Sequence, residues 1–139
     1  MAKKNTSAEL GLLIMNAGRL LHQKMQATGI GPVSMLRFKI LRFIGERGPT
    51  AMKDLAGFLG VTAPSATVLV NRLTRTGELA RVASRGDRRS VNVKITKLGQ
   101  RTLSRDQKAL IGRMGLILSC LRKSEVNDLT VILKNLLKK

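Results

Sequence analysis

The sequence has few of the side chains from which enzymes build active sites. Its 139 residues include one histidine, one cysteine and three phenylalanines, with no tyrosine and no tryptophan. Catalysis needs a nucleophile beside a base, a pair of carboxylates or a metal cage, and these residues supply none of them. No glycine-rich phosphate loop is visible either. We therefore expect a protein that is not an enzyme and that holds no cofactor and no metal.

A single cysteine, Cys120, cannot form an internal disulfide, which excludes a secreted fold built on disulfides. The apolar run near the N-terminus is interrupted by Asn16 and Arg19, so we expect no signal peptide there. No stretch is apolar for long enough to cross a membrane. The expected compartment is the cytoplasm, or the nucleoid within it. Cys120 and His22 are open to sensing roles, although a lone residue of either type beside apolar positions is more often structural.

Acidic residues are also scarce. Eight Asp and Glu stand against 26 Lys and Arg, which gives a formal net charge of +18. Such an imbalance in a short chain favours a polyanionic partner, with nucleic acid ahead of an anionic membrane surface. The alternative is that the charge reflects the general composition of the host's proteins or serves solubility.

The length fits one domain, and 43% apolar residues suffice for a core. Periodicity predicts the element order α-α-α-α-β-β-α-α. The expected helices cover about 6–27, 34–46, 50–59, 62–76, 96–121 and 124–137, and the expected strands 79–84 and 90–96. Side chains suited to capping open most of these helices, and the expected N-caps are Thr6, Ser34, Thr50, Thr62 and Ser124.

The helices expected over 50–59 and 62–76 form a helix-turn-helix. Gly60 ends the first, Thr62 can cap the second, and Pro64 stands in the first turn, where a missing N–H costs nothing. In the second helix an apolar stripe is formed by Ala66, Leu69, Val70 and Leu73. The opposite face carries no acid and consists of Pro64, Ser65, Thr67, Val68, Asn71, Arg72 and Arg75. Short polar side chains followed by guanidiniums suit a helix that reads a major groove, while the plainer alternative is an ordinary solvated face.

The two expected strands form a hairpin with a basic tip. Between them the chain reads Arg85-Gly86-Asp87-Arg88-Arg89. A hairpin tip cannot pack on its own core, so its charges point to solvent or to a polyanion. A carboxylate two residues before an arginine can pair with it, which makes Asp87 a plausible brace for Arg89.

These residues resemble the MarR family of winged helix-turn-helix transcriptional regulators. The more specific part of the match is a D-x-R wing followed by a hydrophobic-Thr pair. The matching positions, all within 50–99, are Leu55-Ala56, the run from Thr62 to Gly77 with Asn71-Arg72-Leu73, Asp87-Arg88-Arg89, Ile95-Thr96 and Gly99.

The resemblance implies a fold that is mainly α with a small β-hairpin (α+β), and dimerisation helices at both ends. It implies a homodimer on a pseudo-palindromic operator in double-stranded DNA, with helix 62–76 in the major groove and Arg89 in the minor groove. Surplus apolar residues on the terminal helices also favour a dimer. We expect dimerisation helices over 1–30 and 97–139 and a DNA-binding module over 31–96, in one intertwined domain that does not bind membranes.

The resemblance also implies a response to small, often aromatic and anionic, ligands. A pocket between the dimerisation helices and the DNA-binding module would draw on Arg19, His22, Met25, Met35 and Phe38. The family's aromatic lining is missing, because we expect the three phenylalanines in the core. The ligand is then aliphatic, or the protein responds to another signal or to none.

Three functions from different classes stay open. The leading one is a sequence-specific transcriptional regulator, with repression favoured over activation. The second is an architectural nucleoid protein that binds DNA without reading bases, and the third is a basic adaptor that binds proteins. Ser65, Thr67, Asn71 and Arg72 favour the first, since an architectural protein needs only lysine and arginine there.

Overall fold

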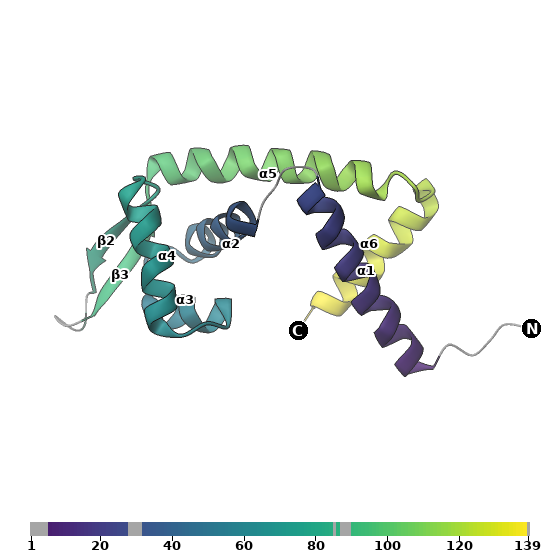
Figure 1. Ribbon diagram of the computed structural model, residues 1–139, viewed down its shortest axis with the longest axis horizontal. Helices are drawn as coiled ribbons and strands as arrows, with labels where there is room; N and C mark the ends of the chain where they lie inside the picture. Colours follow the sequence, from purple (N-terminus) through teal and green to yellow (C-terminus); the bar gives the residue numbers. More distant parts are fainter. Residues whose placement is uncertain (1–5, 28–31, 85, 87–89, 139) are drawn as a thin grey trace, which may run out of the picture. The chain divides into compact units, whose positions relative to one another are not determined.

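The computed structural model describes residues 6–27, 32–84, 86 and 90–138. It is mainly helical with a small antiparallel sheet, which confirms the expected fold class (Figure 1). Its elements are α1 (Ser7–Ala27), α2 (Pro32–Arg47), β1 (Thr50–Ala51), α3 (Met52–Leu59), α4 (Ala63–Arg75), β2 (Leu79–Ala83), β3 (Val91–Ile95), α5 (Lys97–Leu118) and α6 (Lys123–Leu137). None of the helices in the described part is long and apolar enough to cross a bilayer.

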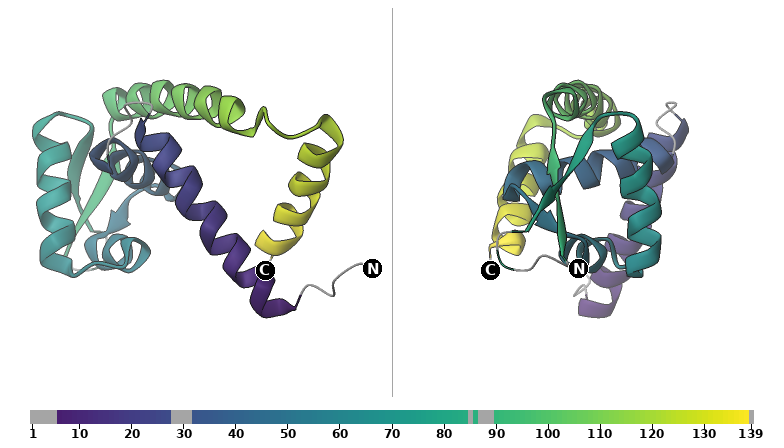
Figure 2. Two further views of the ribbon diagram at one scale, coloured as in Figure 1. Left: turned by 45° about the vertical axis from the view of Figure 1, so that its right-hand side comes forward. Right: turned by 90° about the vertical axis from the view of Figure 1, so that its left-hand side faces the viewer.

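The chain divides into two compact units. The central unit is Gly31–Ala109, and the terminal unit combines Met1–Ile30 with Leu110–Lys139. The central unit holds the sheet, the helix-turn-helix and the first part of α5. In both views of Figure 2, α4 runs alongside the β2–β3 hairpin.

The sheet has one strand more than the sequence predicted. Its order is β1-β3-β2, with Thr50 opposite Val93 and Leu79 opposite Ile95. The expectation that Thr50 caps α3 was wrong. Its backbone pairs with β3, and its hydroxyl donates to the carbonyl of Gly48 at 2.8 Å, so Ala51 becomes the N-cap. A strand of two residues is too short to show an alternating pattern.

The helix-turn-helix forms as predicted. Gly60 ends α3 in the left-handed region at φ 65°, and its N–H reaches the carbonyls of Ala56 and Gly57. The Thr62 hydroxyl caps α4 by accepting from the backbone N–H of Ser65 at 3.3 Å, and Pro64 lies in the first turn. These two caps fix where each helix stops and starts.

The core of the central unit lies between α2, α3, α4 and the sheet. The predicted stripe of α4 is buried at Ala66, Val70 and Leu73. Helix α2 begins at Pro32, two residues before the expected cap at Ser34, and the most deeply buried of its side chains are Ile40, Leu41 and Ile44. The buried apolar side chains that pack together are Ile40, Leu41, Ile44, Leu55, Val70, Leu73, Leu79 and Val93.

The terminal unit contains α1, α6 and the end of α5. Thr6 caps α1, as predicted, by accepting from the backbone N–H of Glu9 at 3.3 Å. The predicted cap of α6 at Ser124 was wrong, because the helix starts after Arg122. Glu125 accepts from the Arg122 backbone N–H at 2.8 Å and from its guanidinium at 2.9 Å. The Arg122 side chain, and then its backbone N–H, lower the pKa of Glu125 below its ordinary value.

Helix α5 starts in close contact with the turn between α4 and β2. A Cβ on Gly99 would lie 2.1 Å from the carbonyl oxygen of Glu78 and 2.7 Å from Cγ1 of Ile95. Backbone atoms cannot give way as the tip of a side chain can, so only glycine fits at this position without moving α5.

We predict that Gly99→Ala lowers the free energy of unfolding by about 1–3 kcal/mol, because the new methyl group overpacks the contact with Glu78. Urea unfolding measures the change. Gly57→Ala is the control, since its Cβ would meet nothing within 4 Å inside a helix. That variant should gain up to about 1 kcal/mol. Equal stabilities for both variants would contradict the close contact.

Candidate nucleic-acid interface

The residues proposed to read DNA from α4 share one face of that helix. Pro64, Ser65, Val68, Asn71, Arg72 and Arg75 are exposed, and Thr67 is half-buried. Val68 is 65% exposed in the middle of the face, although it is apolar. The face therefore offers a methyl-bearing side chain, an amide and two guanidiniums, and it carries no acid.

The hydroxyl groups at the start of α4 have defined roles. Thr62 donates its hydroxyl hydrogen to Ser65 Oγ at 3.0 Å, so the Ser65 O–H stays available as a donor. Thr67 donates its hydroxyl hydrogen to the carbonyl of Ala63 at 2.9 Å, so its oxygen keeps lone pairs that can accept a hydrogen bond. A donor and an acceptor thus stand near each other at the end of the helix that would enter a groove first.

The hairpin continues this surface. Strands β2 and β3 pair from Leu79 opposite Ile95 to Ala83 opposite Val91, and Ser84 N–H donates to the carbonyl of Ser90 at 3.3 Å. The predicted wing residues Arg85, Asp87, Arg88 and Arg89 lie outside the described residues.

Arg81 was missed by the sequence analysis. It lies on β2, and its Nη2 donates to Oδ1 of Asn71 on α4. Both side chains are exposed. No periodicity relates a helix residue to a strand residue ten positions later, so only the packing of α4 against β2 could show this pair.

The turn from α4 into β2 is held by backbone bonds. Gly77 adopts φ 82°, its N–H donates to the Thr74 carbonyl at 3.1 Å, and the Glu78 N–H donates to the Leu73 carbonyl at 2.9 Å. These two bonds form a Schellman motif, which satisfies the last carbonyls of α4.

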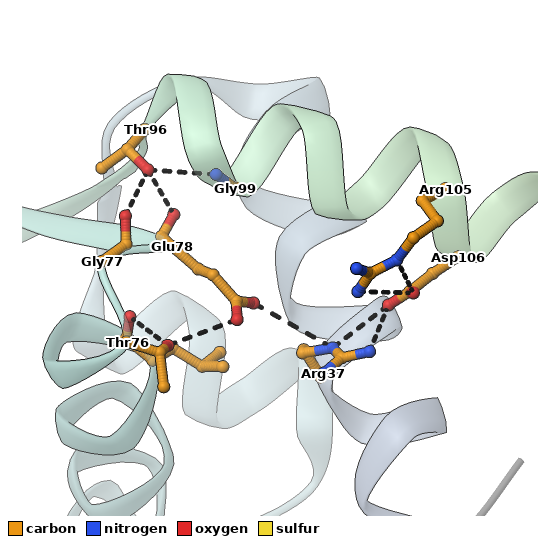
Figure 3. A network of polar contacts seen from close by, with 9 residues as sticks. Arg37, Thr76, Gly77, Glu78, Thr96, Gly99, Arg105 and Asp106 are labelled. Carbon is orange, nitrogen blue, oxygen red and sulfur yellow. Dashed lines mark hydrogen bonds and ion pairs between the residues drawn. The ribbon is translucent and has the colours of Figure 1, made fainter.

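Thr96 fastens this turn to the start of α5 (Figure 3). Its hydroxyl lies 2.5 Å from the Gly77 carbonyl oxygen and 3.2 Å from that of Glu78. The same oxygen accepts from the Gly99 backbone N–H at 3.1 Å and so caps α5. One side chain therefore joins the C-terminal end of α4 to the N-terminal end of α5.

Arg37 on α2 makes a second link between these elements (Figure 3). Its Nη2 and Nε donate to Oδ2 of Asp106 on α5 at 2.7 Å and 3.1 Å. Its Nε also lies 4.0 Å from Oε2 of Glu78, a side chain that is buried in the turn. Within the described residues, that oxygen accepts no hydrogen bond. Arg37 is therefore the cation that balances it.

The residues expected to bind a small ligand fall in both units. Arg19 and His22 are exposed on α1, where His22 bonds to Gln26 at 3.0 Å, and Met25 is buried. In the central unit, Met35 and Phe38 border a hollow of about 360 Å³ together with Lys39, Arg42, Phe43, Glu46 and Phe58.

The expectation that the core claims all three phenylalanines was wrong for Phe58. Its ring is 50% exposed and stacks on Phe43 with centroids 4.1 Å apart. The guanidinium of Arg47 lies over the other ring, 5.0 Å from the centroid of Phe43. Cys120, the other candidate for a sensing role, is exposed and lies in the turn after α5.

Comparison with known proteins agrees with this geometry. The model of the MarR family matches residues 29–90. The uncharacterised HTH-type transcriptional regulator YpoP of Bacillus subtilis (strain 168) is 32% identical over 71 residues, which are 51% of this chain and 50% of YpoP. FarR, an HTH-type transcriptional regulator of Neisseria gonorrhoeae, is 28% identical over 98 residues, or 70% of this chain and 66% of FarR. The apo form of wild-type E. coli MarR matches with a TM-score of 0.76 at 27% identity, over 92% of this chain and 96% of that one. Residues 29–90 thus match the MarR family, and the fold over most of the chain is that of E. coli MarR.

These matches confirm the resemblance to the MarR family seen in the sequence. The family model ends at residue 90, whereas the match to the E. coli MarR structure extends over most of the chain. The chain spans less than two thirds of YpoP and of FarR. The shared fold thus extends beyond the helix-turn-helix itself.

We predict that Arg37→Met destabilises the central unit by about 1–3 kcal/mol, because it leaves Glu78 and Asp106 without their shared cation. Adding Glu78→Gln should recover part of the loss, since it removes the unbalanced buried charge. Urea unfolding of the single and double variants measures both effects.

Arg42→Met is the matched control on the same helix. Arg42 pairs with Glu46 at 2.8 Å, but both side chains are more than 60% exposed. Its loss should therefore change stability by less than about 0.5 kcal/mol. Equal losses for the Arg37 and Arg42 variants would show that the Arg37 contacts add nothing beyond a surface pair.

Proposed function

We propose that this MarR-family protein is a transcriptional regulator that binds double-stranded DNA as a homodimer and reads a pseudo-palindromic operator. The observation that carries the proposal is the exposed, acid-free face of α4. It places hydroxyls at the N-terminal end, Val68 and Asn71 in the middle, and Arg72 and Arg75 at the far end. Such a face suits a major groove, where amides and methyl-bearing side chains meet base edges and guanidiniums meet phosphates or guanines.

The net charge supports the same partner. The +18 charge of the chain would attract the duplex and release its counterions, so binding should weaken steeply as salt rises. In this proposal Arg85, Arg88 and Arg89 extend the basic surface into the minor groove, and Asp87 holds Arg89 in place. The expected site of action is the nucleoid in the cytoplasm, and repression would follow if the operator overlaps a promoter.

The terminal unit supports dimerisation. Helix α6 has no buried residue among those described, and most of its apolar side chains are exposed, with Leu136 at 69% and Leu137 at 80%. Helix α1 likewise exposes a group of large apolar side chains, namely Leu10, Leu12, Leu13, Ile14, Met15 and Leu20. Apolar surface on this scale is typical of an interface between subunits. We propose that 1–30 and 97–139 bury it against a second copy of the chain.

The second candidate is an architectural protein that binds DNA without reading it. The +18 charge favours it as much as it favours the regulator. The centre of the α4 face argues against it, because Val68 and Asn71 are neutral and add nothing to attraction for phosphates. Release by a small ligand would be a further property, with Arg19, His22, Met25, Met35 and Phe38 as candidate contacts.

We predict that Asn71→Ala and Arg75→Ala weaken DNA binding in different ways. Losing the amide should remove discrimination at one or two base positions, by roughly 1–3 kcal/mol for each lost contact. Losing the guanidinium should weaken binding to every sequence alike. Selection from a randomised duplex library, followed by titration of selected and scrambled duplexes, measures both. If both variants lose affinity equally for selected and scrambled duplexes, the result would favour the architectural protein.

We predict a dimer mass in sedimentation equilibrium and a shift to monomer for Leu136→Glu, which places a charge in the proposed interface. Asn127→Glu is the control, because this exposed residue stands nine positions before Leu136, on the opposite face of α6, and should leave the dimer intact. A monomer mass for the unmodified protein would contradict the two-fold model of operator binding.

A further inference from the structure

The pair formed by Arg81 and Asn71 bears on which base the protein selects. We propose that Arg81 orients the Asn71 amide so that the two side chains together present hydrogen-bond donors to the major groove, which selects guanine over adenine at that position of each half-site. This proposal rests on the proposed function, since it assumes that α4 enters the groove.

The bond itself defines the orientation of the amide. Nη2 of Arg81 can only donate, and within the carboxamide only Oδ1 can accept. The contact between Arg81 and Asn71 therefore turns Oδ1 toward β2 and leaves the NH₂ group as the free end. Asn71 stands in the middle of the exposed face of α4, where a side chain of its length can reach a base edge.

This orientation conflicts with the usual way in which asparagine reads adenine. That contact uses both ends of the amide, with Oδ1 accepting from the N6 amino group and Nδ2 donating to N7. Oδ1 retains a second lone pair, but an amino group approaching it would also meet the guanidinium of Arg81. Two donors would then face each other, one of them positively charged, so adenine is disfavoured.

Guanine fits the same pair of side chains. Its major-groove edge offers two acceptors, O6 and N7, and no donor. The free N–H of Asn71 and a second N–H of Arg81 supply two donors side by side. The guanidinium is available for this role, because none of the ion pairs among the described residues involves Arg81.

The experiment compares base preferences across four proteins. The unmodified protein, Arg81→Ala, Asn71→Ala and the double variant each select duplexes from the same randomised library at one salt concentration. The unmodified protein should prefer guanine at one position of each half-site by roughly 5- to 150-fold, the range for a good two-point contact. Arg81→Ala frees Oδ1, so the preference at that position should move to adenine while the others stay unchanged.

The remaining variants decide whether the two residues act together. Asn71→Ala should lower discrimination at the same position. The double variant should lack the adenine preference of Arg81→Ala, because the amide that contacts adenine is gone. Arg75→Ala is the control. Loss of this exposed guanidinium on the same helix should lower the affinity for all sequences and leave the guanine preference unchanged. Circular dichroism confirms that each variant is folded.

Two results separate the failure of this inference from the failure of the proposed function. If the unmodified protein enriches no sequence, the proposed function itself is wrong. If it enriches an operator but Arg81→Ala weakens all sequences equally, with every base preference unchanged, Arg81 is a phosphate contact only. The proposal that it orients Asn71 is then rejected.

Discussion

Helix α5 begins so close to the turn between α4 and β2 that only glycine fits at Gly99. The Thr96 hydroxyl uses this proximity, because it bonds to the carbonyls of Gly77 and Glu78 and also caps α5. Arg37 then ties the buried Glu78 and Asp106 to α2. These contacts join the two ends of the proposed DNA-binding surface, the end of α4 and the base of the hairpin, to the helix that leaves the central unit. A surface that reads bases must hold its side chains in place, and in the proposed function these contacts provide that support.

The same arrangement explains how Asn71 on α4 and Arg81 on β2 come close enough to contact one base together in the proposed complex. Because the turn after α4 is fixed, β2 returns beside that helix, and Arg81 reaches Asn71. An asparagine alone would be expected to select adenine, whereas an asparagine bonded to an arginine presents donors. The specificity of the proposed operator contact thus depends on the fold around α4 as well as on the residues along it.

Local signals in the sequence were enough for the helix-turn-helix. The cap at Thr62, the stop at Gly60 and the buried stripe of α4 each depend on neighbours within one or two turns, and the structure confirms all three. Features that depend on distant partners were missed or wrong. Thr50 pairs with a strand more than 40 residues away, and Arg37 meets Asp106 across 69 positions. One local feature was also wrong: at α6, Arg122 displaced Ser124 as the cap, because its side chain and its backbone N–H both reach Glu125, three residues away.

The central claim, that the protein reads DNA as a two-fold dimer, is tested most directly by hydroxyl-radical footprinting on a duplex selected from a random library. A dimer with α4 in the major groove should protect two symmetric segments whose centres lie about 10 base pairs apart, or a multiple of that distance. The protection should disappear when the sequence of either segment is scrambled. One continuous protected region that is indifferent to sequence would contradict the claim.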